Sequence, residues 1–417
     1  MTIDTTITAA QRAGALLRSS ALLLEVGESD IALAGLDRAD VLESGVPQVK
    51  RARAIALAQM GRPLDAAREL LEELALAPDD GDAFRTFLGM VDRIPEIQAL
   101  PRSTFFRSLL ARLDAAAERR FPGRGGACTL QRAALYAAMV LRHGPAFETT
   151  YAALGDDASR DWMLEVSALV ALGDERVRLR FDEEGLEEFR ARSEQELLRE
   201  RGGDLGLYDL ASAGLPLRVI TSARSLASLA YLGQYDLDRE GAHVGPQRGD
   251  VVLDGGGGVG DAAVWFAHRL GSAGRVYSFE IDPARREVFA ENLRLNPWAA
   301  GRVELVPEAL DARTGPPASP GRPPRRSVDD FVEERGLERV DFLKLDIGGA
   351  EANALAGAEA TLRRFRPRLA IALHHRPEDL AVLPAHVVGL GLGYRIFVGQ
   401  FAPGARETML FALSDLQ

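Results

Sequence analysis

The stretch Asp254-Gly255-Gly256-Gly257-Gly258-Val259-Gly260-Asp261 decides the fold of the C-terminal half of this chain. It follows a short β-rich run, Val251-Val252-Leu253, and a predicted helix begins where it ends. Glycine lets a backbone turn sharply and approach a ligand that a Cβ atom would repel. Glu280 follows Gly260 by 20 positions, where a carboxylate can accept hydrogen bonds from both ribose hydroxyls of a nucleoside. Together these features predict a site for an adenosine-containing cofactor.

β-rich and helical runs alternate from about residue 249 onward. The later β-rich runs are 276–279, 303–306, 342–345 and 369–373, with helical runs at 284–295 and 350–364. This alternation predicts right-handed crossovers and a parallel sheet covered by helices on both faces. Ligands in such sheets bind beyond the carboxyl ends of the strands, which is where the glycine-rich loop lies.

The last two β-rich runs, 394–398 and 408–412, are separated by only nine residues, so no crossover helix fits between them. They must therefore pair as an antiparallel hairpin. A parallel sheet ending in an antiparallel seventh strand is typical of class I, Rossmann-like methyltransferases. The spacing Gly256-x-Gly258-x-Gly260 also fits their loop better than the G-x-G-x-x-G dinucleotide fingerprint. We expect S-adenosylmethionine as the cofactor, and an NAD-dependent dehydrogenase is the less favoured alternative.

The first hundred residues contain a weak 34-residue repeat. Its members, in two corresponding sets, are Gly61, Ala66, Leu70 and Pro78, and Gly27, Ala32, Leu36 and Ser44. Glycine at the turn, alanine at the helix contact and proline at the exit resemble the tetratricopeptide repeat. A generic helical bundle is the alternative, because the terminal proline is missing from the first unit. Apolar periodicity continues the helices in 107–113 and 161–166, and the charged run 183–201 is predicted to be an exposed helix.

These patterns divide the chain into three predicted domains. Residues 1–100 are tetratricopeptide-like repeats, 101–202 a helical continuation, and 203–417 the methyltransferase domain. An all-α N-terminal domain thus precedes a seven-stranded α/β domain.

Composition bounds the class of partner and the compartment. Fifty Lys and Arg residues against 61 Asp and Glu give a net charge of −11, which favours a small-molecule substrate over nucleic acid. The single cysteine, Cys128, excludes an internal disulfide framework and a cysteine-rich metal site. The start, Met1–Asp4, lacks a basic region followed by an apolar run, and no run approaches the roughly 20 apolar residues of a membrane span. We expect a cytoplasmic protein without a membrane anchor.

Several motifs downstream of Gln234-Tyr235 resemble the FkbM family of methyltransferases. They are 254–261, Tyr277-Ser278-Phe279-Glu280, Asn292 to Pro297, Ser327 to Phe331, Val340 to Asp346, Gly349-Ala350-Glu351, His375 to Asp379 and Glu407-Thr408. They occur in order and at family-like spacing as far as about residue 413. The resemblance implies methyl transfer, usually to a hydroxyl, often of a sugar, polyketide or other specialised metabolite in natural product biosynthesis.

The sequence departs from the family pattern at three positions. Gly348 stands where the family has an acid, Ala262 where it tends to have threonine, and His374 where it tends to have tyrosine. The missing acid keeps a second hypothesis open, in which the methyltransferase fold has lost catalysis. The chain would then be a scaffold whose helical repeats hold a protein partner.

The predicted cofactor site combines the glycine-rich loop with neighbouring polar positions. Its residues are Asp254, Gly255, Gly256, Gly258, Gly260, Asp261, Glu280, Ile281, Glu308, Ala309, Gln234 and Tyr235. Glu308-Ala309 follows the third strand and would lie near the adenine, or is a simple loop acid. Gln234-Tyr235 would close over the methionine end of the cofactor, or packs against the sheet.

The predicted catalytic residues are Asp346 and His375, which follow the fourth and fifth strands. Methyl transfer needs an aligned acceptor oxygen and a group that takes its proton. Asp346 is a candidate base or orienting group, with helix capping as the alternative. His375 has a suitable unperturbed pKa for a base. With Glu351 and Asp379, both are also candidate Mg²⁺ ligands, and Mg²⁺ would acidify the acceptor hydroxyl.

The sequence also bears on the proline-rich segment and on the oligomeric state. The proline-rich segment 311–326 is expected to lack regular structure, as a disordered insertion or a lid. A homo-oligomer is also compatible with the sequence.

Overall fold

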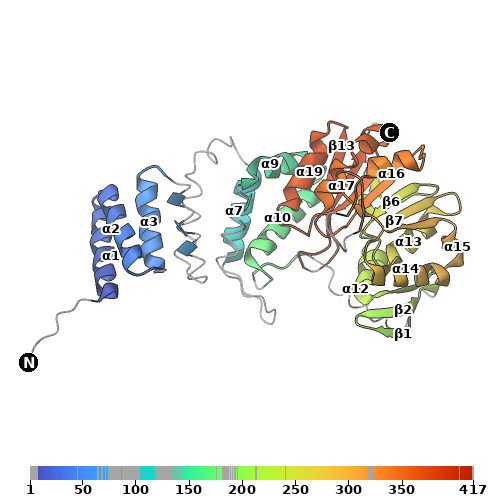
Figure 1. The fold of residues 1–417 in the computed structure, drawn as a ribbon, viewed down its shortest axis with the longest axis horizontal. Coiled ribbons are helices and arrows are strands. Elements are labelled where there is room, and N and C mark those ends of the chain that lie inside the picture. The colour runs from blue at the N-terminus through green and yellow to red at the C-terminus, as the bar shows by residue number, and fades with distance from the viewer. Residues whose placement is uncertain are drawn as a thin grey trace, which may run out of the picture. The chain divides into compact units, whose positions relative to one another are not determined.

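The computed structural model describes most of the chain, shown in Figure 1. The described residues are 8–44, 46–62, 65–66, 69–70, 72–73, 86, 104–117, 136, 139–140, 142–174, 176–180, 187, 189, 191, 194, 196–211, 214–239, 241–317, 323–402 and 404–415. The chain forms two compact units, Met1–Glu148 with Ser167–Arg178, and Thr149–Val166 with Leu179–Gln417. The predicted domain limits at residues 100 and 202 stay a prediction.

The first unit is helical, as predicted. Its described helices are α1 (Ala9–Glu25), α2 (Ser29–Leu42), α3 (Pro47–Gln59) and α7 (Thr104–Ala117). The Thr8 hydroxyl accepts a hydrogen bond from the Gln11 N–H, and the Gln11 side chain accepts one from the Thr8 N–H, a capping box that starts α1. α1, α2 and α3 pack around small buried residues such as Ala32 and Ala39.

The repeat prediction is only partly within the described residues. Gly27 follows α1 and Gly61 follows α3, and both have left-handed backbones, with φ of 84° and 74°. Such a glycine commonly ends a helix because it carries no Cβ penalty there. Pro78 lies outside the described residues, as does Cys128. The tetratricopeptide reading therefore stays a prediction.

Helices α9 (Gly144–Ala153) and α10 (Asp157–Leu172) continue the helical region. Within the second unit, Thr150 Oγ1 donates a hydrogen bond of 2.8 Å to the carbonyl of Ala381. Ser159 Oγ accepts one of 2.9 Å from the Val398 N–H. These contacts attach residues 149–166 to the C-terminal α/β elements.

The prediction of an exposed helix over residues 183–201 is wrong at its C-terminal end. Residues from Leu197 form β1 (Leu197–Gly202), which pairs with β2 (Leu205–Asp209), and β2 pairs with β3 (Arg218–Ser222). Gly202 and Gly203 have φ of 97° and 64° and allow the tight hairpin between β1 and β2. The glycine pair favours the turn over the helical continuation that the charged residues suggest.

The second unit contains the predicted seven-stranded sheet. Its strands are β6 (Val251–Gly255), β7 (Arg275–Phe279), β8 (Val303–Val306), β11 (Phe342–Leu345), β12 (Arg368–Ala372), β13 (Tyr394–Gln400) and β14 (Thr408–Ser414). They are arranged in the order β13-β14-β12-β11-β6-β7-β8. β14 is antiparallel to both β12 and β13, whereas the other neighbouring pairs are parallel. The predicted class I methyltransferase architecture is confirmed.

The helices of the second unit are α12 (Ala223–Leu226), the π-helix η2 (Ala227–Tyr231), α13 (Asp261–Leu270), α14 (Pro283–Leu295), α15 (Pro297–Ala300), α16 (Val328–Glu334), α17 (Glu351–Ala356), α18 (Glu359–Phe365) and α19 (Asp379–Gly389). α13 contacts α14 and α15, and α16 contacts α18. The short strands β4 (Leu237–Arg239) and β5 (Ala242–Val244) form a separate antiparallel pair.

Two local predictions need correction. The helix predicted over 350–364 is divided at Gly357, where a Cβ atom would lie only 2.2 Å from the carbonyl oxygen of Asp311. The segment 311–326 is not wholly irregular, because β10 (Arg325–Arg326) at its end pairs in parallel with β9 (Ala309–Leu310). Residues 318–322 lie outside the described residues.

Phe266 of α13 connects the core to the edge of the sheet where the site lies. It is fully buried, and its ring contacts those of Tyr235 and Phe342 at centroid distances of 5.7 and 6.0 Å. Aromatic pairs at such distances stabilise a packed core. The ring of Tyr235 is thus held by the core, and because Tyr235 also lines the crevice, both predicted alternatives stay predictions.

Candidate active site

A crevice of about 210 Å³ lies at the carboxyl ends of β6 and β11. Its lining combines the glycine-rich loop with polar side chains, namely Ser225, Ser228, Leu229, Gln234, Tyr235, Gly256, Gly257, Gly258, Asp261, Ala262, Arg285, Lys344, Asp346 and Glu407. Residues from five separate parts of the chain therefore meet at the sheet edge that the sequence predicts.

The loop glycines serve two different purposes. A Cβ atom on Gly256 would lie 1.9 Å from the Asp346 carbonyl oxygen, and one on Gly260 would lie 2.6 Å from the Phe289 ring. Packing alone thus requires glycine at both positions. All three glycines have positive φ, but Gly258 differs because no atom lies within 4 Å of an added Cβ. Its bare backbone faces the open crevice, as a loop that approaches a ligand should.

Glu280 is held next to this loop by backbone donors. Its Oε2 accepts a hydrogen bond of 2.8 Å from the Gly258 N–H, and its Oε1 accepts one of 2.7 Å from the Asp282 N–H. The side chain is only 5% exposed. Each oxygen keeps a lone pair for a further donor. The neighbouring Ile281 is exposed.

A buried ion pair lies beneath the loop. Lys344 Nζ is 2.9 Å from Asp254 Oδ1 and donates to the carbonyls of Gly255 and Gly256 at 3.0 and 2.6 Å. Ser278 Oγ donates to the other oxygen of Asp254 at 2.6 Å. Burial alone would lower the pKa of Lys344, but the charges of Asp254 and Asp346 raise it above its ordinary value.

This pair changes the role of one predicted residue and adds another. Asp254, predicted to bind the cofactor, is fully buried and lies beneath the loop rather than among the residues that line the crevice. Lys344 lines the crevice and was not predicted to take part. A lysine inside an otherwise apolar buried strand, Phe342–Leu345, is the sequence signal that could have identified it.

Asp346 follows β11 and meets polar groups from three directions. Tyr235 donates its hydroxyl to Asp346 Oδ2 at 2.9 Å. On the other side, Nε2 of His375 and of His374 lie 3.5 and 3.9 Å from Asp346 Oδ1. Burial would raise the pKa of Asp346, but Lys344 and the two histidines lower it below its ordinary value. Asp346 is therefore an ionised hydrogen-bond acceptor at neutral pH.

His375 is oriented by Glu351 of α17. Its Nδ1 lies 2.9 Å from Glu351 Oε1, and this hydrogen bond raises the pKa of His375. Glu351 is almost fully buried and also accepts a hydrogen bond of 2.8 Å from the Ile347 N–H. Burial would raise the pKa of Glu351, but these partners lower it. The carboxylate thus fixes the ring so that Nε2 points toward Asp346.

Asp379 begins α19 and accepts a hydrogen bond of 3.0 Å from the Arg376 N–H. Burial and the charge of Glu351 raise the pKa of Asp379 to about 6. A carboxyl with a raised pKa binds its proton more tightly in the folded state, so its contribution to stability is present below pH 4 and lost as pH rises through 6.

We expect Asp379→Asn to become progressively more stable than the parent protein between pH 4 and pH 7, by about 1–2 kcal/mol in total. The measurement is the free energy of unfolding in denaturant at several pH values. Glu359→Gln removes an exposed acid of α18 and serves as the control for loss of one charge. If the difference in unfolding free energy between Asp379→Asn and the parent protein does not change with pH, the raised pKa of Asp379 is contradicted.

Gln234 and Asp261 are both held at the crevice by side-chain partners. Gln234 donates its side-chain amide to Glu407, which has a left-handed backbone with φ of 61°. Asp261 accepts a hydrogen bond from the Thr221 hydroxyl. Burial raises the pKa of both Glu407 and Asp261, and in Glu407 the charge of Asp346 adds to it. Glu407 is a further crevice residue that the predicted site did not include.

Glu308 and Ala309, predicted to lie near an adenine, are not among the crevice residues. Both oxygens of Glu308 accept hydrogen bonds from the Arg326 guanidinium, at 2.8 and 2.9 Å. Ala309 belongs to β9. Glu308, just after β8, thus binds Arg326 at the end of the proline-rich segment.

Gly348, which replaces the family acid, has a backbone reason to be glycine. Its φ is 71°, and no atom lies within 4 Å of an added Cβ. L residues with side chains rarely adopt this conformation, so an acid here would strain the backbone.

The candidate metal ligands form a different set from the predicted one. Within the described part of the chain, Asp346, His374 and His375 bring their ligand atoms within 4.8 Å of one another. Glu351 instead lies behind His375, on its Nδ1 side. Asp379 is not part of the group.

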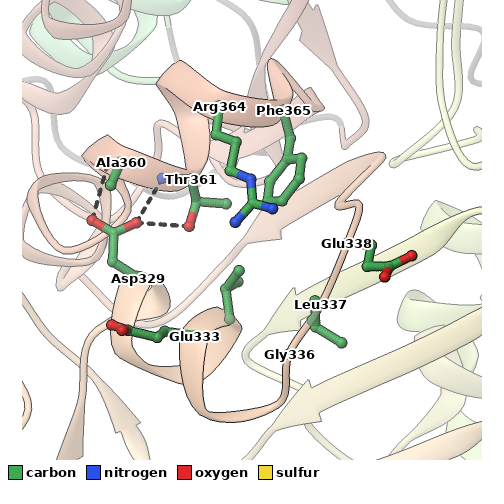
Figure 2. A pocket seen from close by; sticks show the side chains of 10 residues that line it. Asp329, Glu333, Gly336, Leu337, Glu338, Ala360, Thr361, Arg364 and Phe365 are labelled. Atoms are coloured by element: carbon green, nitrogen blue, oxygen red, sulfur yellow. Dashed lines mark hydrogen bonds between the residues drawn. The ribbon is translucent and has the colours of Figure 1, made fainter.

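A second cavity, of about 380 Å³, lies between α16 and α18 (Figure 2). Figure 2 shows Asp329 with its hydrogen bonds to the N–H groups of Ala360 and Thr361, which measure 3.0 and 2.7 Å. Asp329 therefore caps the start of α18. Its lining includes residues 336–338, which precede β11, and 364–365, which precede β12, and shares no residue with the crevice.

The fold and the crevice define the class of this unit. A sheet ending in an antiparallel β14, with a glycine loop after β6, is the class I fold of S-adenosylmethionine-dependent methyltransferases. Residues 241–396 match the family model described as the methyltransferase FkbM domain. This part of the chain is therefore similar to the FkbM family, as the sequence resemblance predicts.

Solved structures show the same kind of similarity. The chain is similar to methyltransferase FkbM from Methylobacillus flagellatus KT, with 20% identity, coverage of 66% of this chain and 60% of that one, and a TM-score of 0.46. It is also similar to Aeropyrum pernix fibrillarin with natively bound S-adenosyl-L-methionine, at 18% identity, 52% and 97% coverage and a TM-score of 0.30. An O-methyltransferase from Bacillus cereus in complex with SAH is 17% identical, with coverage of 57% of this chain and 93% of that one and a TM-score of 0.30.

The chain spans about 60% of the length of the Methylobacillus protein. A search of the curated proteins gave no match. Within the part of the chain that the structure describes, no helix has both the length and the apolar character needed to cross a bilayer.

Proposed function

We propose that this chain binds S-adenosylmethionine in the crevice and transfers its methyl group to a hydroxyl of a small molecule. The observation that carries the proposal is the position of Asp346. This ionised carboxylate lines the same crevice as Gly256, Gly257 and Gly258, so a cofactor at the loop would present its methyl group beside it.

The residues at the loop fit the proposed cofactor. The bare backbone of Gly258 leaves room for a ligand, and Glu280 offers its remaining lone pairs to ribose hydroxyls. Gln234 and Asp261 supply polar atoms elsewhere in the crevice, where an amino acid moiety would need them. When bound, S-adenosylmethionine supplies an activated methyl group.

Asp346 and His375 would act on the methyl acceptor. Asp346 accepts a hydrogen bond from the acceptor hydroxyl and thereby orients its oxygen. His375, whose ring Glu351 fixes, takes the hydroxyl proton at Nε2. The low pKa of Asp346 makes it the weaker base, which favours His375 as the proton acceptor.

The test is calorimetric. We expect S-adenosylhomocysteine to bind with micromolar-range affinity, whereas NAD does not bind. Glu280→Ala should weaken S-adenosylhomocysteine binding by about 1.5–3 kcal/mol, because it removes hydrogen bonds to a charged group. Glu359→Ala, which removes an exposed acid on α18, should leave the affinity unchanged. Tight NAD binding without S-adenosylhomocysteine binding would end the methyltransferase proposal.

The scaffold alternative makes the opposite prediction about turnover. A domain that has lost catalysis would bind S-adenosylhomocysteine yet methylate none of a panel of hydroxylated sugars and polyketides. Gly348 supports this alternative less than its sequence position suggests, because its left-handed backbone accounts for the glycine. Incorporation of labelled methyl groups distinguishes the two.

The roles predicted beyond the crevice belong to the same proposal. They are a protein partner for the helical region, a homo-oligomer, a specialised metabolite as acceptor, and a cytoplasmic location. Each rests on the sequence.

A further inference from the structure

His374, His375 and Asp346 meet because their strands are neighbours. β11 ends at Leu345, which pairs in parallel with Ile371 near the end of β12. The residues that follow the two strands therefore leave the sheet at the same edge. This arrangement places two imidazoles beside Asp346, the member of the group that lines the crevice.

The three side chains are spaced like ligands that share an ion. Nε2 of His375 and of His374 lie 3.5 and 3.9 Å from Asp346 Oδ1, longer than ordinary hydrogen bonds. Metal-to-ligand bonds of roughly 2.0–2.2 Å place the ligands of one tetrahedral ion about 3.3 Å apart. The three ligand atoms lie within 4.8 Å of one another, so the side chains would have to move closer together to share one ion.

The outer nitrogens of both rings are already engaged. Nδ1 of His375 lies 2.9 Å from Glu351 Oε1, and Nδ1 of His374 lies 3.2 Å from the Thr408 carbonyl oxygen. A carbonyl oxygen only accepts hydrogen bonds, so Nδ1 of His374 carries the proton and Nε2 keeps its lone pair. Metal-binding histidines characteristically donate their second N–H to a carboxylate or a backbone carbonyl in this way.

Asp346 is oriented as well, and the local charges allow a cation. Tyr235 donates to its Oδ2 at 2.9 Å, which leaves Oδ1 directed toward the two rings. The nearby positive charge of Lys344 is paired with Asp254 at 2.9 Å. The negative charge of Asp346 is therefore available to a metal ion.

We propose that Asp346, His374 and His375 bind a divalent transition-metal ion, with Glu351 and the Thr408 carbonyl positioning the two histidines. Imidazole nitrogen suits zinc, iron or cobalt, whereas magnesium prefers an all-oxygen set. The predicted Mg²⁺ site is thus replaced by a site of different composition. While Nε2 of His375 holds the ion it cannot take the proton of the acceptor, so metal binding and proton transfer through His375 are alternative uses of this nitrogen. Only the use of the ion in methyl transfer rests on the proposed function.

The test uses Co²⁺ as a spectroscopic probe on the full chain after treatment with a chelator. We expect one Co²⁺ per chain, visible by its d–d absorption, displacement by Zn²⁺, and no competition from equimolar Mg²⁺. His374→Gln and His375→Gln should each weaken Co²⁺ binding more than tenfold. Glu351→Gln, which alters only the positioning group, should weaken it 10–100-fold and change the absorption spectrum.

The control is His386→Gln, which removes an exposed histidine of α19 and should leave Co²⁺ binding unchanged. Circular dichroism shows whether each variant is folded. Absence of stoichiometric Co²⁺ binding in the parent protein would overturn the proposal, as would His374→Gln and His375→Gln variants that are folded and bind normally.

The outcome is separable from that of the proposed function. Binding of S-adenosylhomocysteine is measured on the metal-free protein. If that binding occurs without Co²⁺ binding, the metal site alone is refuted and the role of His375 in proton transfer stands. If Co²⁺ binds but S-adenosylhomocysteine does not, the methyltransferase proposal fails and the metal site stands.

Discussion

Lys344→Met is expected to destabilise the second unit by about 3–5 kcal/mol, since it leaves Asp254 buried without its positive partner. The substitution also removes the donor to two carbonyls of the glycine loop. Denaturant unfolding followed by tryptophan fluorescence measures the effect. The three tryptophans, Trp162, Trp265 and Trp298, all lie in this unit, so the signal reports its unfolding.

The matched variant is the double substitution Asp254→Asn with Lys344→Met. Removing both charges should restore much of the loss, because buried ion pairs are costly mainly when one partner is missing. A single Lys344→Met variant as stable as the parent protein would show that the ion pair does not hold the loop. A double variant no better than the single one would assign the loss to the carbonyl contacts.

The second large effect concerns turnover. Asp346→Asn and His375→Ala should each lower the rate of methyl transfer by about 10²–10⁴-fold, the usual contribution of a group that positions or deprotonates the reacting hydroxyl. Affinity for S-adenosylhomocysteine should stay within a few-fold, because neither side chain contacts Gly258 or Glu280. The measurement pairs steady-state rates with calorimetry on the same preparations.

His386→Ala is the control for loss of a histidine. Near-full turnover in both Asp346→Asn and His375→Ala would place the base elsewhere or leave the proton to bulk water. The turnover of His374→Gln distinguishes two mechanisms. If His375 alone takes the proton, turnover should stay near that of the parent protein. If the reaction needs a metal ion held by His374, turnover should fall.

Much of the fold could be predicted because its signals are local. Alternation of β-rich and helical runs, the glycine loop and the short final hairpin together specify the order and direction of the sheet strands. The misassigned elements depend on contacts between distant residues. At Gly357, where the predicted helix divides, the distant Asp311 carbonyl leaves no room for a Cβ atom. The pairing of β9 with β10 likewise joins segments on either side of a proline-rich loop.

The site was predictable where position along a strand determines it. Asp346 and His375 follow neighbouring parallel strands, so their meeting at one edge could be inferred. Side chains that reach the crevice from other parts of the fold could not be inferred in this way. Glu407 reaches the crevice from the start of β14 through an unusual backbone conformation, and no spacing rule places it beside Gln234.

The close contact between Gly256 and the Asp346 backbone has a consequence for redesign. The Asp346 N–H also donates a hydrogen bond of 3.0 Å to the Gly255 carbonyl. The glycine loop after β6 and the Asp346 backbone after β11 are therefore in direct contact at two points. A change that widens this loop for a bulkier sulfonium analogue would shift Asp346 as well. Enlarged cofactor tolerance should therefore be sought on the Gly258 side, where the backbone borders open space.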